Sequence, residues 1–175
     1  IILYAPTFRE RESAVRLAPA FWRELSAALD PAHTVLVNLH PNDRQSSIPA
    51  GLNNVVDISG RGLDIQEVMR VADLLITDYS SIATDFVLTQ KPFLIFGYDY
   101  DDYKKTSRDL YYAIEEVFQI PILKTAEELI ACMRARPWHD SESYQRQYRR
   151  FALEFNQYFD GMSTSRVVDA MDQLA

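Results

Sequence analysis

The chain has 175 residues, a length that suits a single domain. Hydrophobic residues make up 47% of it, which is enough for a sizeable core and excludes a disordered chain. The formal net charge of −7 argues against a nucleic-acid-binding protein, because such proteins normally carry a basic face.

A single cysteine, Cys132, excludes an internal disulfide framework and a cysteine-rich metal site, and it fits a cytoplasmic protein. The three histidines do not have the spacing of metal ligands, so we expect neither a metal nor another cofactor. No apolar run reaches the roughly 18 residues that a membrane span needs.

The first half of the chain alternates predicted strands and helices. Ile1–Ala5 reads as a buried strand that Pro6 ends, and Arg16–Leu29 has the apolar spacing of a helix. Strands are predicted over Thr34–Leu39 and Asn53–Ile58. A helix then begins at Asp64, which has the form of a capping box with Glu67.

The second half continues the alternation. Leu74–Thr77 and Pro92–Phe96 are continuous apolar runs, typical of strands buried on both faces of a parallel sheet. The helices predicted here are Ser80–Thr89, Thr125–Arg134, Ser143–Phe159 and Ser165–Leu174. The pattern predicts an α/β fold of three layers, with a mainly parallel sheet between helices.

Three further features bear on domain organisation. The chain opens directly in a strand and has no initiator Met, so we expect an N-terminal partner domain that is absent from this sequence. The aromatic, acidic stretch Gly97–Tyr112 reads either as a loop that packs on that domain or covers a cleft, or as a second small core cluster. Basic residues are relatively frequent after residue 132, which indicates either a solvated helix face or contact with an acidic lipid or polymer.

Polar residues follow four of the predicted strands. Because ligands bind beyond the carboxyl ends of parallel strands, these residues are expected to gather at one site. In chain order the candidates are Thr7, Arg9, His40, Ser59, Asp78, Ser80 and Ser81.

The turn from Asp78 to Ser81 passes from a buried strand into a helix, whose first N–H groups favour a phosphate. Ser80 could instead be only a helix cap. Asp85, four residues after Ser81, could bind ribose hydroxyls or be a solvated acid. His40 could bind a phosphate or stabilise a leaving phosphate, although a lone histidine is more often structural.

Several of these segments carry a family likeness along nearly the whole chain. They are Tyr4–Arg9, His40-Pro41, Asp64-Ile65, Ala72–Ser81, Lys91-Pro92 and Asp160–Arg166. In this order they resemble the CDP-glycerol glycerophosphotransferase family.

The resemblance implies a GT-B architecture, in which two Rossmann-like domains enclose a cleft, and residues 1–175 would be the C-terminal, donor-binding domain. It implies transfer of a polyol phosphate from a CDP-polyol to a polymer or lipid-linked acceptor such as a growing teichoic acid, with release of CMP. His40 would act in catalysis, and Thr7, Arg9, Ser59, Asp78, Ser80, Ser81 and Asp85 would bind the donor. Peripheral contact with the inner face of the cell membrane is expected, and this piece alone should be inactive.

Two alternatives stay open. A GT-B glycosyltransferase or epimerase that uses a UDP-sugar would have a similar sheet, and only nucleotide preference would separate the two. A non-catalytic domain that binds nucleotide or polymer would keep binding without turnover.

Overall fold

The computed structural model describes residues 1–8, 17–40, 48–106, 116–117 and 120–174, although the side chains of 104–106 are not described. Six strands form one parallel sheet in the order β3-β2-β1-β4-β5-β6. The strands are β1 Ile2–Tyr4, β2 Val35–Val37, β3 Val55–Asp57, β4 Leu74–Thr77, β5 Phe93–Phe96 and β6 Ile122–Leu123. This order confirms the prediction of a parallel α/β sheet.

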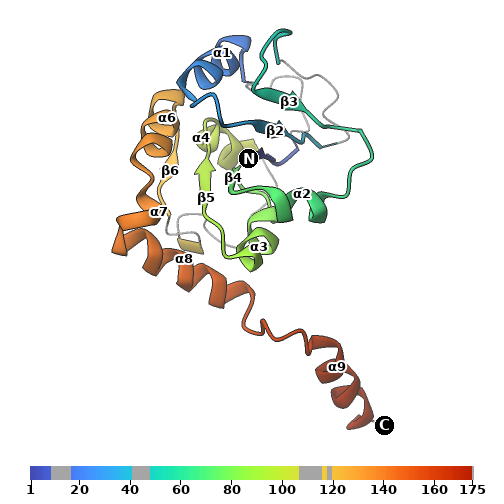
Figure 1. Ribbon diagram of the computed structural model, residues 1–175. Helices are drawn as coiled ribbons and strands as arrows, with labels where there is room; N and C mark the ends of the chain where they lie inside the picture. The colour runs from blue at the N-terminus through green and yellow to red at the C-terminus, as the bar shows by residue number, and fades with distance from the viewer. Residues whose placement is uncertain (9–16, 41–47, 107–115, 118–119, 175) are drawn as a thin grey trace.

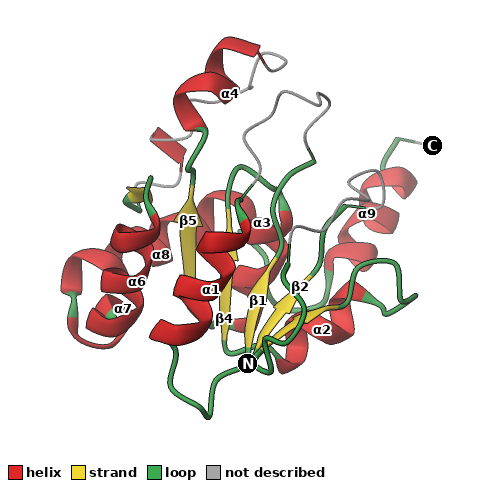
Figure 2. Ribbon diagram, turned by 90° about the horizontal axis from the view of Figure 1, so that it is seen from above, coloured by secondary structure: helices red, strands yellow, loops and turns green. Residues whose placement is uncertain are grey.

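Helices cover both faces of the sheet (Figure 1, Figure 2). The described helices are α1 Pro19–Ala28, α2 Ile65–Val71, α3 Ile82–Phe86, the 3-10 turn η1 Val87–Thr89, α4 Tyr100–Thr106, α6 Ala126–Ala135, α7 Pro137–Asp140, α8 Glu142–Phe155 and α9 Ser163–Asp172. Among these described helices, none is long and apolar enough to cross a membrane.

Alternate side chains of each strand supply the two halves of the core. On β4, Leu74 and Ile76 pack with α1 and α6, whereas Leu75 packs with α2, α3 and α8 on the other face. Phe93 and Leu94 divide between the two faces of β5 in the same way. This period of two explains why the central strands are apolar at every position.

The structure corrects four details of the prediction. Part of Gly97–Tyr112 forms helix α4, and the short strand β6 and helix α7 were not predicted. The Asp64 carboxylate accepts from Gln66 N at 2.9 Å, while Glu67 pairs with Arg70 instead of closing a capping box. A complete capping box occurs instead at Thr125, where the α6 helix begins.

The end of α8 shows where the packed part of the chain stops. The predicted helix Ser143–Phe159 ends at Phe155, and Asn156 Nδ2 donates to Thr84 O at 2.7 Å. Every side chain from 157 to 174 is exposed, and α9 lies well away from the sheet (Figure 1). Helix α9 therefore contributes nothing to the core among the residues described.

Two tyrosines fasten α8 to the sheet. Tyr144 Oη donates to Phe93 O at 2.8 Å and accepts from Phe93 N at 3.0 Å. Tyr148 Oη is within hydrogen-bond distance of Lys91 O at 2.9 Å and Val87 O at 3.2 Å. Burial raises the pKa of both phenols, that of Tyr148 to about 12.

Replacing Tyr148 by Phe should lower the free energy of unfolding by about 1–2 kcal/mol, because carbonyl groups of Val87 and Lys91 lose their donor. Denaturant titration at pH 7 measures this difference. Tyr158→Phe is the matched control, because Tyr158 is 56% exposed and should lose much less stability. An equal loss in the two variants would contradict the assigned role.

The same variant makes a prediction about pH. The folded pKa of Tyr148 lies above the ordinary value of 10, so its contribution is complete below about pH 10 and is lost as pH rises towards 12. The stability difference between wild type and Tyr148→Phe should therefore be constant from pH 7 to 9 and shrink above about pH 10. A difference that grows above pH 10 would contradict it.

Lys91 joins the start of β5 to the end of helix α2. Its Nζ donates to Arg70 O and to Ala72 O, both at 2.6 Å, and so closes the C-terminal end of α2. A cation at this end is favoured because the last carbonyl groups of a helix lack partners.

Lys91→Met should accordingly cost about 1–2 kcal/mol of stability, measured by denaturant unfolding. Lys124→Met serves as the control, because the pair between Lys124 and Asp101 is exposed, and such pairs contribute little. If Lys91→Met proves as stable as Lys124→Met, the helix-capping role is wrong.

Candidate functional site

The candidate site lies where the connections of the sheet change direction. Strands β1 and β4 are neighbours in the centre of the sheet. From β1 the chain continues to β2, towards one edge of the sheet, and from β4 it continues to β5, towards the other edge. In open parallel sheets this arrangement leaves a crevice beyond the carboxyl ends of the two central strands. Thr7 and Phe8 follow β1 at this point, and Asp78 to Ser81 follow β4.

Hydrogen bonds join the segments that follow β1 and β4. Thr77 Oγ1 donates to Ala5 O at 2.7 Å. Asp78 Oδ1 accepts from Thr7 N and from Thr7 Oγ1, each at 2.7 Å, and from Ser80 N at 3.2 Å. Asp78 is only 1% exposed, so its carboxylate is committed to these internal contacts. The structure thus brings the predicted residues Thr7, Asp78 and Ser80 together.

The two serines of the turn are in different situations. Ser80 Oγ accepts from Ile82 N at 3.4 Å, a long contact that makes a weak cap. Ser81 stands at the N-cap position of α3, is exposed, and makes no side-chain cap bond. The Ser81 hydroxyl therefore remains available to a ligand. Asp85, on the same short helix, is also exposed.

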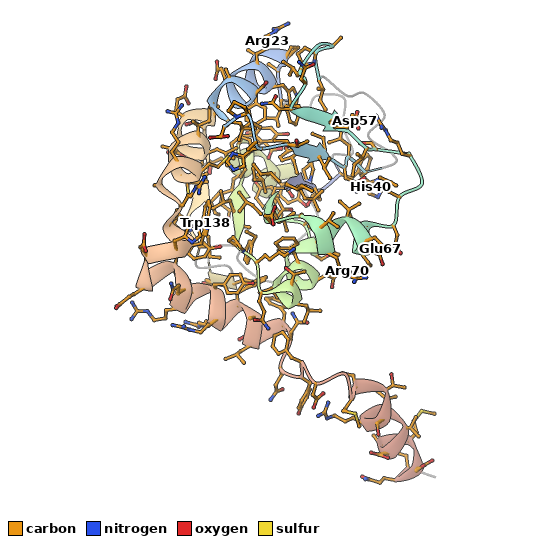
Figure 3. All side chains as sticks on the ribbon, viewed as in Figure 1. Arg23, His40, Asp57, Glu67, Arg70 and Trp138 are labelled. Atoms are coloured by element: carbon orange, nitrogen blue, oxygen red, sulfur yellow. The ribbon has the colours of Figure 1, made fainter. Side chains whose placement is uncertain are left out.

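His40 follows β2, the neighbour of β1. Its ring lies 5.1 Å from the Phe8 ring, centroid to centroid, with 36° between the planes. The side chain is exposed and lies on the same side of the domain as Asp57 (Figure 3). His40 and the Ser80 turn are thus at the same edge of the sheet, with the end of β1 between them.

Ser59 has a structural partner as well as a place at this edge. Its Oγ accepts from Leu39 N at 2.8 Å and lies 3.4 Å from Val37 O, while Asp57 Oδ1 accepts from Ser59 N at 2.9 Å. These bonds fix the path of the backbone immediately before His40. Binding of a ligand by Ser59 stays a prediction, and predicted Arg9 lies outside the described residues.

Tyr79, which the sequence did not single out, links the turn to the end of β5. Its ring lies 4.4 Å from that of Tyr103 and 5.4 Å from that of Tyr100, and its hydroxyl is 3.4 Å from Asp99 Oδ1. A Cβ at Gly97 would lie 2.7 Å from the Tyr79 hydroxyl and 2.8 Å from Ile122 Cγ2, so any other residue there would displace one of these side chains.

These contacts answer part of the question raised by Gly97–Tyr112. Tyr100 is 4% exposed and belongs to the core, and Tyr98 packs against Phe96. These two tyrosines therefore act within the domain, as the core-cluster interpretation predicts. Tyr111 and Tyr112 lie outside the described residues, so the covering role of that part stays a prediction.

A separate cavity of about 610 Å³ lies at the opposite, amino edge of the sheet, lined in part by Ile2, Leu74, Leu25 and Trp138. Trp138 and His40 lie on different sides of the domain (Figure 3). We place the candidate site at the carboxyl edge because the polar groups that could bind a phosphate converge there. Over the described ranges, no cluster of His, Cys, Asp and Glu side chains could hold a metal ion.

The last family motif, Asp160–Arg166, lies outside the site and is held by an ion pair between its first and last residues. Asp160 Oδ1 accepts from Met162 N at 3.0 Å and from Arg166 Nη1 at 2.9 Å, and the other nitrogen of the guanidinium contacts Oδ2. The Arg166 guanidinium, helped by the Met162 amide, holds the pKa of Asp160 well below its usual range. The guanidinium also covers the Tyr158 ring at 4.3 Å. These contacts hold the first turn of α9 to the residues immediately before it.

Comparison with known proteins gives consistent relatives. A teichoic acid poly(ribitol-phosphate) polymerase of Bacillus spizizenii is 31% identical over 97% of this chain and 27% of its own length. A teichoic acid glycerol-phosphate primase of the same organism is 28% identical over 99% of this chain and 43% of its own. A structure of a variant of the wall teichoic acid polymerase TagF, soaked with CDPG, matches with a TM-score of 0.66 and 25% identity over 99% of this chain and 43% of that one.

The chain thus spans less than half the length of each of these proteins. The profile of the family described as CDP-glycerol:poly(glycerophosphate) glycerophosphotransferase matches residues 1–172, nearly the entire sequence. The resemblance found in the strand-end motifs is confirmed: the chain belongs to this glycerophosphotransferase family.

Proposed function

We propose that this chain is the donor-binding domain of a transferase that moves glycerol phosphate, or another polyol phosphate, from a CDP-polyol to a hydroxyl of a growing cell-wall polymer. The observation that carries the proposal is the Ser80–Ser81 turn at the adjoining carboxyl ends of β1 and β4, where Ser80 is partly buried and Ser81 is exposed. Family membership and the names of the relatives support it, and so does the CDPG used with TagF.

The reaction needs positioning and charge stabilisation more than covalent chemistry by the protein. An acceptor hydroxyl oxygen attacks the β-phosphorus of the donor. The bond from that phosphorus to the bridging oxygen breaks, CMP leaves with the bond's electron pair, and the hydroxyl proton passes to a base. In this chain, the Ser80 and Ser81 hydroxyls would donate to the pyrophosphate, and a protonated His40 would stabilise the leaving phosphate.

The acceptor side and the base would belong to a second domain. Helix α9 supports this part of the proposal, because its exposed apolar residues Val167, Val168 and Met171 lie within one turn of each other and stay uncovered among the described residues. Asp169 and Asp172 on the same helix make an acidic lipid surface a poor partner for it. We propose that α9 packs against the second domain.

Peripheral membrane contact is a separate part of the proposal. Arg146 and Arg149 are exposed on α8, and Arg134 and Arg136 lie at the end of α6. Such a group of arginines is suited to acidic lipid headgroups or to an anionic polymer, since both present phosphate groups.

The donor site makes a direct prediction. Ser81→Ala and His40→Ala should each weaken CDP binding to this chain about tenfold or more, because a hydrogen bond to a charged group contributes roughly 1.5–3 kcal/mol. Isothermal titration calorimetry with CDP, and with UDP for comparison, measures the effect. Asp85→Ala should weaken nucleoside binding without changing the affinity for inorganic pyrophosphate.

The matched controls are His139→Ala and Ser143→Ala, which remove the same groups from exposed positions away from this edge. They should leave the dissociation constant and the melting temperature unchanged. Wild-type affinity in His40→Ala and Ser81→Ala would refute the site, and a preference for UDP over CDP would favour a sugar-nucleotide enzyme instead.

The two-domain proposal makes its own prediction. This chain alone should stay folded but release no CMP from CDP-glycerol above the rate in buffer, because half of the cleft supplies neither base nor acceptor site. Circular dichroism checks the fold, and chromatography of the nucleotides checks turnover. Measurable CMP release by this chain would show that the second domain is not needed.

A further inference from the structure

A single oxygen atom connects the segments that follow β1 and β4. Asp78 Oδ1 accepts two bonds from Thr7, through its amide and its hydroxyl, and one from the Ser80 amide. Thr7 follows β1 and Ser80 follows β4, so this oxygen determines how far apart the two loops are. Bonds to a carboxylate are shorter and stronger than those between neutral groups.

The position of this oxygen follows from the hydrogen-bond ladder of the sheet. The last regular bond between the two strands on this side runs from Ala5 N to Ile76 O at 3.0 Å. Only every second N–H of β1 faces β4, so the next donor from β1 would be Thr7 N, with the carbonyl of Asp78 as its acceptor. The amide of Thr7 bonds to the side chain of Asp78 instead.

The carboxylate thus takes the place of the Asp78 carbonyl as the acceptor for Thr7 N. Because the side chain accepts this bond, the Asp78 backbone can turn out of the sheet towards Ser80 and Ser81. Thr7 nevertheless stays bonded to the residue that follows β4. The same side chain cannot hold a pyrophosphate itself, since a carboxylate only accepts hydrogen bonds and repels another anion.

We propose that Asp78 is a positioning residue that sets the spacing of the Thr7 and Ser80 loops required to bind the pyrophosphate of a nucleoside diphosphate. The ligand class rests on the proposed function, whereas the tie between the loops rests on the hydrogen bonds alone. Asp78 therefore acts on the ligand through Thr7 and Ser80 and does not touch it.

Three variants test the role. Asp78→Asn keeps the shape of the side chain and an acceptor oxygen but loses the charge. Thr7→Val removes one donor and leaves Asp78 with both amides, and Thr7→Ser retains the hydroxyl as the conservative replacement. Asp169→Asn, on exposed α9, is the control for the loss of one negative charge.

Two measurements are needed on each variant, namely the exchange rates of the Thr7 and Ser80 amides by NMR and the affinity for CDP by calorimetry. Asp78→Asn should speed the exchange of both amides about tenfold and weaken CDP binding by a similar factor. Thr7→Val should weaken CDP binding less, Thr7→Ser should restore it, and Asp169→Asn should change neither quantity.

Two results with Asp78→Asn would overturn the proposal. Weaker CDP binding with both amides still protected would mean that Asp78 contacts the ligand directly. Faster exchange with unchanged CDP affinity would mean that the tie is structural only. If Asp78→Asn fails to fold, equal CDP affinity of Thr7→Val and Thr7→Ser overturns the proposal instead. Absence of CDP binding by the wild-type chain would refute the proposed function, and the exchange rates would still decide whether Asp78 ties the loops.

Discussion

The Asp78 carboxylate joins β1 and β4 just beyond the point where the backbone hydrogen bonds between these strands end. Strands β1 and β4 are neighbours whose chains depart to opposite sides, so their regular backbone pairing ends at Ala5 and Ile76. Unpaired polar groups at such a buried position would be costly. The side chains of Thr77 and Asp78 supply the missing partners, and the loops that could bind a ligand depend on them.

The family motifs divide into residues that hold the fold and residues that face outward. Lys91 caps α2, Asp78 joins the segments after β1 and β4, and Asp160 with Arg166 holds the first turn of α9 to the residues before it. His40 and Ser81, by contrast, are exposed at the carboxyl edge. A motif match therefore does not by itself identify a ligand-binding side chain, and the hydrogen bonds distinguish the two kinds.

Much of the fold could be predicted because its signals are local. Continuous apolar runs identified β4 and β5, and the position of polar residues after the strands placed Thr7, His40 and Ser80 at one edge. Helix α4 was missed because Tyr100 and Tyr103 sit among aspartates, and their packing against Tyr79 depends on contacts distant in sequence. Strand β6 has two residues, too few for a period. The internal role of Asp78 depends on Thr7, 71 residues away, which no local pattern reveals.

The account depends most on the location of the nucleotide, and NMR titration of the isotope-labelled chain with CDP tests this directly. The account predicts that the largest chemical-shift changes fall on Thr7, His40, Ser80 and Ser81, at the carboxyl edge of the sheet. Changes centred instead on Leu25, Trp138 and the other residues of the amino-edge cavity would contradict it.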